Sequence, residues 1–220
     1  MPDGVEVAAL IPAAGSGLRL GLGPKAFVRL GSRTMLQHTA AALAAHVHEL
    51  VVAVPGEVLS RAAEQVPRAR FVAGGATRQQ TVHLLLEATE AEIVLIHDVA
   101  RPFLPAAIVS RIIAAVRTTG AATVARRPAD SLIHAISQRT CDRSSLLLIQ
   151  TPQGFQRDLL LQAHRAARRS GFEATDDAAL VRWSGHAVTV VEGSPWLFKV
   201  TGPEDLELAR ALVESWCHDG

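Results

Sequence analysis

The sequence predicts one α/β domain built on a mostly parallel β-sheet, with a β-hairpin inserted late in the chain. Short apolar runs rich in β-branched residues alternate with longer amphipathic stretches. Strands separated by helices of about 10 to 15 residues connect through crossovers, which leave the strands parallel. A length of 220 residues and an apolar content of 49% are enough for one such domain with a full core.

The expected elements follow in order along the chain. The pattern predicts strands over residues 5–11, 50–54, 71–73, 93–96 and 122–125. Helices are expected between them and after them, over 34–45, 57–66, 78–90 and 105–118. Three further helices, over 157–170, 176–183 and 203–216, and a strand over 187–191 complete a single domain that spans residues 1–220.

Residues 131–149 do not fit this alternation of strands and helices. The segment alternates apolar and polar residues and turns through a polar centre, which predicts a β-hairpin rather than a crossover. A two-stranded ribbon is only marginally stable on its own. We therefore expect this hairpin to be a dimerisation arm that clasps the arm of a second copy across a two-fold axis.

Composition argues against several classes of function. The net charge of +1 provides no global field for nucleic acid or a membrane surface, and 4% aromatic residues with no tyrosine argue against base stacking. Cys141 and Cys217 lie far apart and predict neither a disulfide framework nor a zinc site. The chain shows no signal-peptide pattern and no apolar run of the roughly 18 to 20 residues that a membrane span needs. We expect a cytoplasmic protein.

The segment 11–27, IPAAGSGLRLGLGPKAF, leaves the first predicted strand through a glycine-rich loop. Glycine allows backbone N–H groups to approach an anion closely, so such loops commonly hold phosphate. Of the 22 basic residues, 20 are arginine, and the two lysines, Lys25 and Lys199, both lie near glycine or proline. Because lysine is a compact point charge whereas arginine is a planar fork, we expect both lysines to converge on phosphate.

The loop fails two familiar phosphate-binding patterns. The dinucleotide pattern G-x-G-x-x-G begins at Gly15 and Gly17 but has Leu20 at its third glycine. The Walker pattern requires Gly-Lys-Ser/Thr, whereas Lys25 lies between Pro24 and Ala26. The remaining pattern, A-A-G-x-G-x-R followed by P-K, resembles the signature of enzymes that attach a nucleoside monophosphate to a sugar phosphate.

Five later segments narrow the resemblance. They read GGATRQQTV from residue 74, IHDVARPF from 96, DRSSLLLIQTPQGF from 142, ATDDAALV from 174 and FKVTGPEDL from 198. In this order, from about Val7 to Ala211, the chain resembles the 2-C-methyl-D-erythritol 4-phosphate cytidylyltransferases. The resemblance implies a Rossmann-like nucleotidyltransferase fold, a homodimer, and transfer of the cytidylyl group of CTP to a polyol phosphate, with Mg²⁺ as the cofactor.

The resemblance also implies roles for individual residues. Catalysis is expected from Arg19, Lys25, Arg143 and Lys199. The nucleotide is expected to contact Ala13, Ala14, Gly15, Gly17, Gly74, Gly75, Thr81 and Asp98, with Asp98 also the metal ligand. The substrate is expected to contact Asp98, Arg101, Ser131, Arg143, Thr151, Thr175 and Lys199, with Arg143 reaching across the dimer.

Three positions depart from the family pattern, and three other interpretations remain open. Ala76, Val99 and Ile133 replace an acid, an alanine and a lysine that the family commonly has. A ribitol-5-phosphate cytidylyltransferase shares the glycine loop and the HD-x-x-RP pattern. A Rossmann-type oxidoreductase is disfavoured by the missing third glycine, and a nucleotide-sensing module by the retention of both Arg19 and Lys25. Asp176 and Asp177 could simply be first-turn acids that favour the helix dipole.

Overall fold

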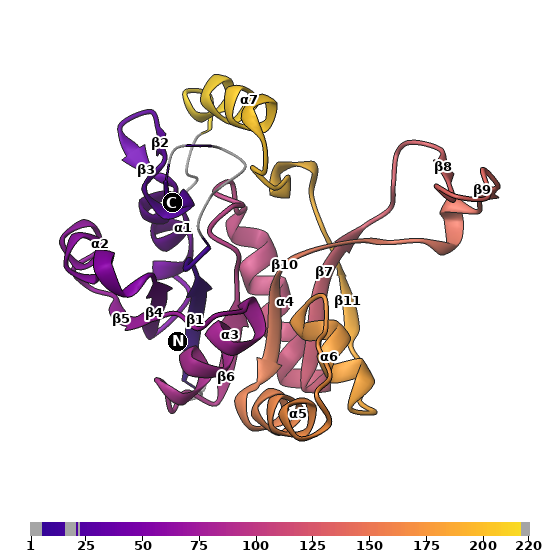
Figure 1. Ribbon diagram of the computed structural model, residues 1–220, viewed down its shortest axis with the longest axis horizontal. Coiled ribbons are helices and arrows are strands. Elements are labelled where there is room, and N and C mark those ends of the chain that lie inside the picture. The colour runs from indigo at the N-terminus through magenta and orange to yellow at the C-terminus, as the bar shows by residue number, and fades with distance from the viewer. Residues whose placement is uncertain (1–5, 16–20, 22, 217–220) are drawn as a thin grey trace.

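A seven-stranded sheet forms the centre of the molecule (Figure 1). The computed structural model describes residues 6–15, 21 and 23–216. The strands lie in the order β11-β7-β10-β6-β1-β4-β5. Their bounds are β1 Val7–Pro12, β4 Glu49–Val54, β5 Arg70–Ala73, β6 Ile93–Ile96, β7 Ala121–Arg126, β10 Leu148–Gln156 and β11 Thr189–Glu192. The mostly parallel α/β sheet predicted from the sequence is confirmed.

Strand β10 is the one strand of the described sheet that runs antiparallel to its neighbours, β6 and β7. The sequence pattern does not reveal this strand, because residues 148–149 continue the alternation of the predicted hairpin and residues 150–156 match no predicted element. Pro152 and Gly154 interrupt the sequence pattern of a strand, because neither residue is favoured in the interior of a sheet. In the fold, Gly154 is required by close packing: a Cβ there would lie 2.6 Å from a methyl carbon of Val116 on helix α4.

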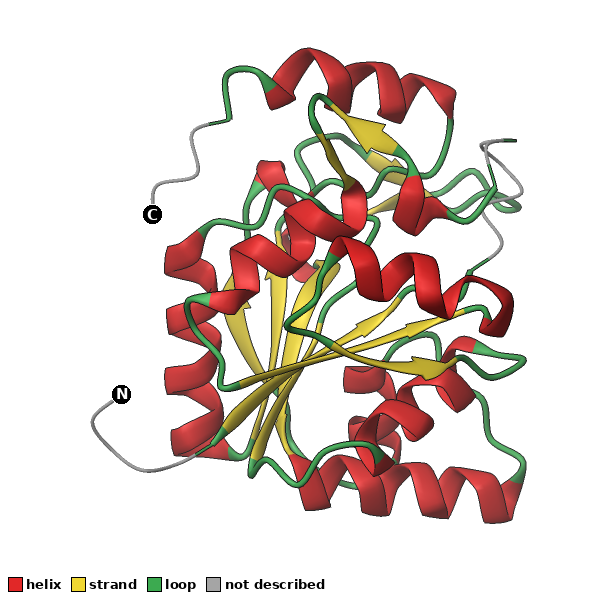
Figure 2. Ribbon diagram, turned by 90° about the vertical axis from the view of Figure 1, so that its left-hand side faces the viewer, coloured by secondary structure: helices red, strands yellow, loops and turns green. Residues whose placement is uncertain are grey.

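Helices cover both faces of the sheet, and each face has its own core (Figure 2). Along β1, Val7, Ala9 and Ile11 belong to one core, whereas Ala8 and Leu10 belong to the other. This continuous apolar pattern is typical of a parallel strand buried on both sides. The first face is covered by α1 Met35–Ala44, α2 Leu59–Gln65 and α4 Ala106–Thr119, and the second by α3 Arg78–Glu87, α5 Arg157–Ser170 and α6 Asp177–Trp183. Helix α7 Pro203–Val213 lies beyond the ends of the strands and adds Leu206 and Ala209 to the first core.

The helix boundaries follow local capping. Thr34 caps α1 with Gln37 in a reciprocal capping box, so the helix begins at Met35, one residue after the predicted start at 34. Helices α4 and α5 end at Gly120 and Gly171, both with a positive φ that suits glycine. Helices α3 and α7 end three residues earlier than predicted, and the short strands β2 Arg29–Leu30 and β3 Arg33–Thr34 were not predicted.

Residues 127–147 form an arm that extends away from the body of the molecule (Figure 1). Its paired part is short, since only β8 Leu132–Ile133 and β9 Thr140–Cys141 pair, followed by the 3-10 turn Arg143–Ser145. The regular ribbon predicted over 131–149 is therefore wrong in extent: its last two residues belong to β10. Apolar side chains are nevertheless exposed on the arm, with Ile133 56% and Ile136 89% accessible.

Within the described part of the chain, the helices lack the length and the apolar character that crossing a membrane would require.

Candidate active site

A pocket of about 480 Å³ opens where β1 and β6 end at their carboxyl ends. Open parallel sheets bind ligands at this edge, because neighbouring crossovers diverge there. Eight of the predicted site residues line the pocket: Ala13, Ala14, Gly15, Lys25, Gly75, Thr81, Asp98 and Lys199. The fold thus brings residues from both ends of the sequence to one hollow.

The glycine pair after β5 is required by close packing against the exit of β1. A Cβ on Gly74 would lie 2.2 Å from the Cβ of Ala14, and one on Gly75 would lie 2.7 Å from the Cβ of Gln80. The turn is held from within by Thr81, whose hydroxyl accepts from the Gly75 N–H at 3.1 Å and donates to the Thr77 carbonyl at 2.9 Å. Thr81 is buried, so in this structure its hydroxyl serves the turn.

The two lysines converge from opposite ends of the sequence. The Nζ of Lys25 donates to the carbonyl oxygen of Val200 at 2.9 Å, and Val200 directly follows Lys199. The Val200 N–H donates to the carbonyl of Ala100 at 2.9 Å, which holds this segment beside the loop after β6. Both lysines line the same pocket, and their expected contact with phosphate stays a prediction.

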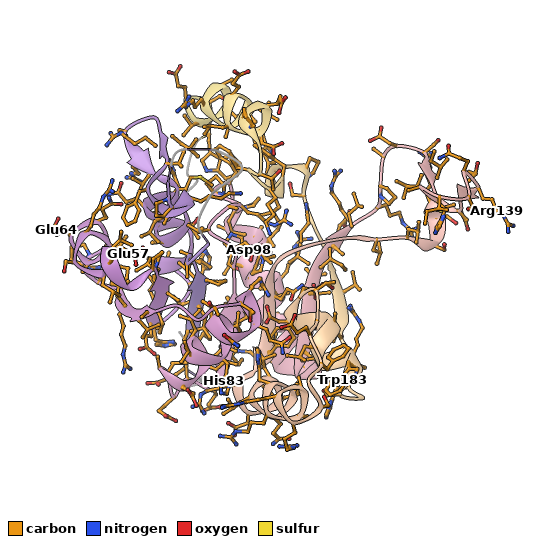
Figure 3. All side chains as sticks on the ribbon, viewed as in Figure 1. Glu57, Glu64, His83, Asp98, Arg139 and Trp183 are labelled. Carbon is orange, nitrogen blue, oxygen red and sulfur yellow. The ribbon has the colours of Figure 1, made fainter. Side chains whose placement is uncertain are left out.

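Asp98 is the charge centre of the pocket, and Figure 3 labels it within the body. Its Oδ2 accepts from Lys199 Nζ at 2.6 Å, and its Oδ1 lies 3.3 Å from Arg78 Nη2. Burial opposes ionisation, but the positive charges of Arg78 and Lys199 outweigh it and hold the pKa of Asp98 well below its usual range. Asp98 is therefore a carboxylate at neutral pH.

Buried hydrogen bonds hold the backbone at Asp98 in place. The Asp98 N–H donates to the Thr151 hydroxyl at 3.1 Å, and that hydroxyl lies 3.0 Å from His97 Nδ1. His97 Nε2 lies 3.0 Å from the carbonyl of Arg101, and burial lowers the pKa of His97 to about 4. The imidazole is thus neutral at pH 7, and it links Arg101, in the turn after β6, to Thr151 on β10.

The other predicted site residues lie elsewhere in the described chain. Thr151 is buried beneath Asp98, and the guanidinium of Arg101 donates to the carbonyl of Leu197, so neither lines the pocket. Thr175 is exposed, with its hydroxyl 3.4 Å from Asp176 Oδ2. Gly17 and Arg19 are outside the described residues.

Two predicted residues, Ser131 and Arg143, belong to the arm. Both are exposed, and Arg143 donates to the carbonyl of Ala129 at the base of the arm. Arg143 lines a hollow there, separate from the pocket that contains Asp98. The fold of one chain therefore does not bring the arm residues together with the body residues.

The sequence analysis missed Arg78, which lines the pocket and contacts Asp98. Arg78 is the first residue of α3 and follows the N-cap Thr77. A signal was present, because a basic residue at the first turn opposes the helix dipole and so needs another reason to be there. Its acidic neighbours supply that reason.

Asp98 is the one carboxylate among the described residues that line the pocket, so it is the residue there that could bind a divalent cation. Among the described residues, no three His, Cys, Asp or Glu side chains gather as a metal cluster. Mg²⁺ usually keeps several waters and takes one or two carboxylates plus substrate phosphates. The ionised carboxylate of Asp98, which lines the pocket, fits this requirement.

At this edge of the α/β sheet, glycine turns, cations and one carboxylate share a pocket, an arrangement expected of a nucleotidyltransferase. The family model for 2-C-methyl-D-erythritol 4-phosphate cytidylyltransferase matches residues 7–215. The chain belongs to this family, which places it among the enzymes of isoprenoid biosynthesis.

Individual relatives agree with this assignment. The Deinococcus radiodurans 2-C-methyl-D-erythritol 4-phosphate cytidylyltransferase is 53% identical over 211 residues, covering 94% of this chain and 90% of the relative. The Thermus thermophilus protein of the same name is 46% identical over 215 residues, covering 96% and 99%. A crystal structure of the enzyme from Thermus thermophilus superposes with a TM-score of 0.85 at 43% identity, covering 96% of this chain and 100% of that one.

Proposed function

We propose that the pocket binds CTP and transfers its cytidylyl group to 2-C-methyl-D-erythritol 4-phosphate. An oxygen of the substrate phosphate attacks the α-phosphorus of CTP in line. A new P–O bond forms, the bond from the α-phosphorus to the bridging oxygen breaks, and pyrophosphate leaves with that electron pair. The observation that carries the proposal is the convergence of Lys25 and Lys199 beside Asp98.

The residues divide into two groups according to the charge that they meet. Lys25, together with Arg19, stabilises the negative charge that grows on the α-phosphate and the departing pyrophosphate. The backbone of residues 13–17 and of the Gly74–Gly75 turn holds the nucleotide. Lys199 turns from Asp98 to the phosphate of the second substrate, since its side chain is 42% accessible. In-line attack then requires positioning rather than a covalent intermediate.

Magnesium would be held by Asp98 and the substrate phosphates, and it would supply charge neutralisation at those phosphates. We propose that the enzyme acts in the cytoplasm.

A homodimer completes the site in this proposal. Exposed apolar side chains on the arm, Ile133 and Ile136, support burial against a second copy, and Leu146, Leu147 and Leu148 are 37 to 42% accessible. Arg143 would then lie over the pocket of the partner chain and orient the substrate phosphate together with Thr175 and Ser131.

Mixed subunits test the shared site. Arg143→Ala chains and Lys25→Ala chains, each poorly active at low substrate concentration, are combined in equal amounts and allowed to exchange. Random pairing makes half of the dimers mixed, and each mixed dimer has one intact site, so about a quarter of the wild-type activity should return. Sites built within single chains would give no recovery.

Pyrophosphate release tests the reaction itself. CTP should support turnover, whereas ATP and GTP should not, because a pocket shaped around a pyrimidine rejects a purine by size and hydrogen bonding. 2-C-methyl-D-erythritol 4-phosphate and ribitol 5-phosphate are compared side by side. Equal turnover of the three nucleotides, or a preference for ribitol 5-phosphate, would contradict the proposal.

A further inference from the structure

Arg78 bridges two carboxylates that lie far apart in the sequence. Its Nη2 is 2.9 Å from Oδ2 of Asp177 and 3.3 Å from Oδ1 of Asp98, and its Nε also donates to that Oδ1 at 3.4 Å. Asp98 follows β6, whereas Asp177 begins α6. A planar guanidinium whose Nη2 contacts two carboxylates, and whose Nε donates to one of them, is restricted in rotation as well as in place.

Helix capping does not account for Asp177. The N-cap of α6 is its neighbour Asp176, whose carboxylate accepts from the Ala179 N–H at 2.9 Å. The side chain of Asp177 is only 2% accessible and faces Arg78 on one side and His164 on the other, with His164 Nε2 3.8 Å from its Oδ1. A carboxylate this buried requires a charged partner, and Arg78 is that partner.

Asp177 matters because two cations contact Asp98, and in the proposed reaction one of them, Lys199, leaves Asp98 for the substrate phosphate. Lys199 and Arg78 each contact one oxygen of Asp98. When Lys199 turns to the substrate phosphate, Arg78 remains as the cation that orients Asp98. A guanidinium with a single partner could follow Asp98 or turn to the substrate, whereas the contact with Asp177 holds it.

We infer that Asp177 and Arg78 are positioning residues, which keep the Asp98 carboxylate in one place and orientation while Lys199 changes partner. Neither residue needs to contact the reacting atoms. The inference rests on the proposed function, because it assigns the pair to the same site. It also explains why the acid at position 177 is buried, which its place in the first turn of a helix does not require.

Asp177→Asn is the first test, because it keeps the shape of the side chain and removes the charge. We expect kcat to fall about tenfold or more, with less than about a threefold change in KM for CTP, because misplacement of a catalytic group acts on the transition state. Asp176→Asn is the matched control: it retains the cap of the same helix, does not contact Arg78, and should keep kcat within about threefold. Equal losses of kcat in both variants would overturn the inference.

A double-mutant cycle tests whether Asp177 acts through Arg78. Arg78→Gln should lower kcat by about as much as Asp177→Asn, and the double variant should match Arg78→Gln within about twofold. Losses that multiply would show that Asp177 acts independently of Arg78 and would overturn the inference. The double variant removes both charges together, so it leaves no buried unpaired carboxylate at position 177 if Arg78→Gln alone does not fold.

Two further measurements separate this inference from the proposed function. Arg78→Lys keeps the charge at a partly exposed position but cannot hold two carboxylates with one fork, so it should fold and lose about tenfold in kcat; full kcat would overturn the inference. Independently of activity, the Nε–H resonance of Arg78 should exchange slowly with water in the wild type and in Asp176→Asn and rapidly in Asp177→Asn. An unchanged resonance would contradict the inference even if the enzyme is active. If CTP is not turned over, the function fails, and the resonance still reports on the pair.

Discussion

The body and the arm of this molecule handle polar and apolar groups in opposite ways. In the body, charged groups lie inside and are paired, as Asp98 and Asp177 are with Arg78. In the arm, apolar side chains lie outside, and Ile136 is 89% accessible. Figure 3 illustrates the separation, with Asp98 in the body and Arg139 at the far end of the arm.

The difference teaches where each region obtains its stability. Seven strands of the body pair within one sheet, and their side chains belong to two cores. The arm pairs only two residues with two others, which is too little for a ribbon that stands alone in water. We therefore expect substitutions in the body to alter stability or chemistry within one chain, and substitutions in the arm to alter only what a second chain contributes.

The largest expected effect compares one cation from each region. Lys25→Ala should lower kcat by about 100-fold or more, with a smaller change in CTP affinity, because the charge it meets develops mainly in the transition state. Arg19→Ala should behave in the same way. Arg139→Ala, at the exposed tip of the arm, should keep kcat within about twofold. Steady-state pyrophosphate release measures all three, and a Lys25→Ala enzyme that loses only CTP binding would refute the assigned role.

The second comparison uses two histidines. Burial lowers the pKa of His97 to about 4, so the unfolded chain binds this proton more readily than the folded one. The free energy of unfolding should keep the full contribution of His97 above about pH 6.5. It should fall by about 3 kcal/mol as the pH approaches 4. His97→Gln should remove most of this slope, whereas His134→Gln in the arm should retain it. His83, whose pKa burial also lowers, contributes in the same direction.

Urea denaturation from about pH 4 to about pH 7.5 measures both histidine variants. A wild-type stability that is flat over this range would contradict the account of His97.

The third prediction concerns the packing of the glycine turn. Gly74→Ala should destabilise the body by about 1 to 3 kcal/mol, because the new Cβ would overlap Ala14. Gly56→Ala is the matched control, since a Cβ there meets nothing within 4 Å, and it should change stability by less than about 0.5 kcal/mol. The denaturation midpoints of the two variants measure this difference. Equal midpoints would show that the turn accommodates the added Cβ at little cost and would contradict the prediction.

The smallest effect on a single chain is expected in the arm. Ile136→Ser should change the unfolding free energy of dilute protein by less than about 0.5 kcal/mol, because this exposed side chain buries little apolar surface within one chain. It should nevertheless shift sedimentation from dimer toward monomer if the arms clasp through this surface. A large loss of stability without any change in mass would break the comparison between the two regions.

Much of the fold could be predicted because the strand and helix patterns are regular. The strands over 50–54, 71–73 and 93–96 lie within one residue of β4, β5 and β6. Strand β10 escaped prediction because its polar and glycine residues are buried by neighbours rather than by an apolar pattern of their own. Gln153, for example, is fully buried and pairs with Asp176 and the Ala178 N–H.

The candidate site was predictable to a smaller degree. The glycine loops, both lysines and Asp98 follow from motifs and lie together at the pocket. Thr151 follows from the same motifs, yet it lies buried beneath Asp98 rather than in the pocket. Arg78 could not be placed, because its importance depends on two carboxylates that only the folded chain brings to it.

The sequence by itself determined the class of fold, the glycine turns and the family, because these depend on local pattern and on motif order along the chain. The tertiary structure alone decided which charges meet. Lys199 lies 101 residues from Asp98 along the chain yet bonds to it at 2.6 Å, and Asp177 is a buried partner of Arg78 rather than a solvent-exposed first-turn acid. Such pairings arise because a buried charge needs a charged partner, and the packing of distant elements decides which side chain lies close enough. Local sequence does not specify that packing.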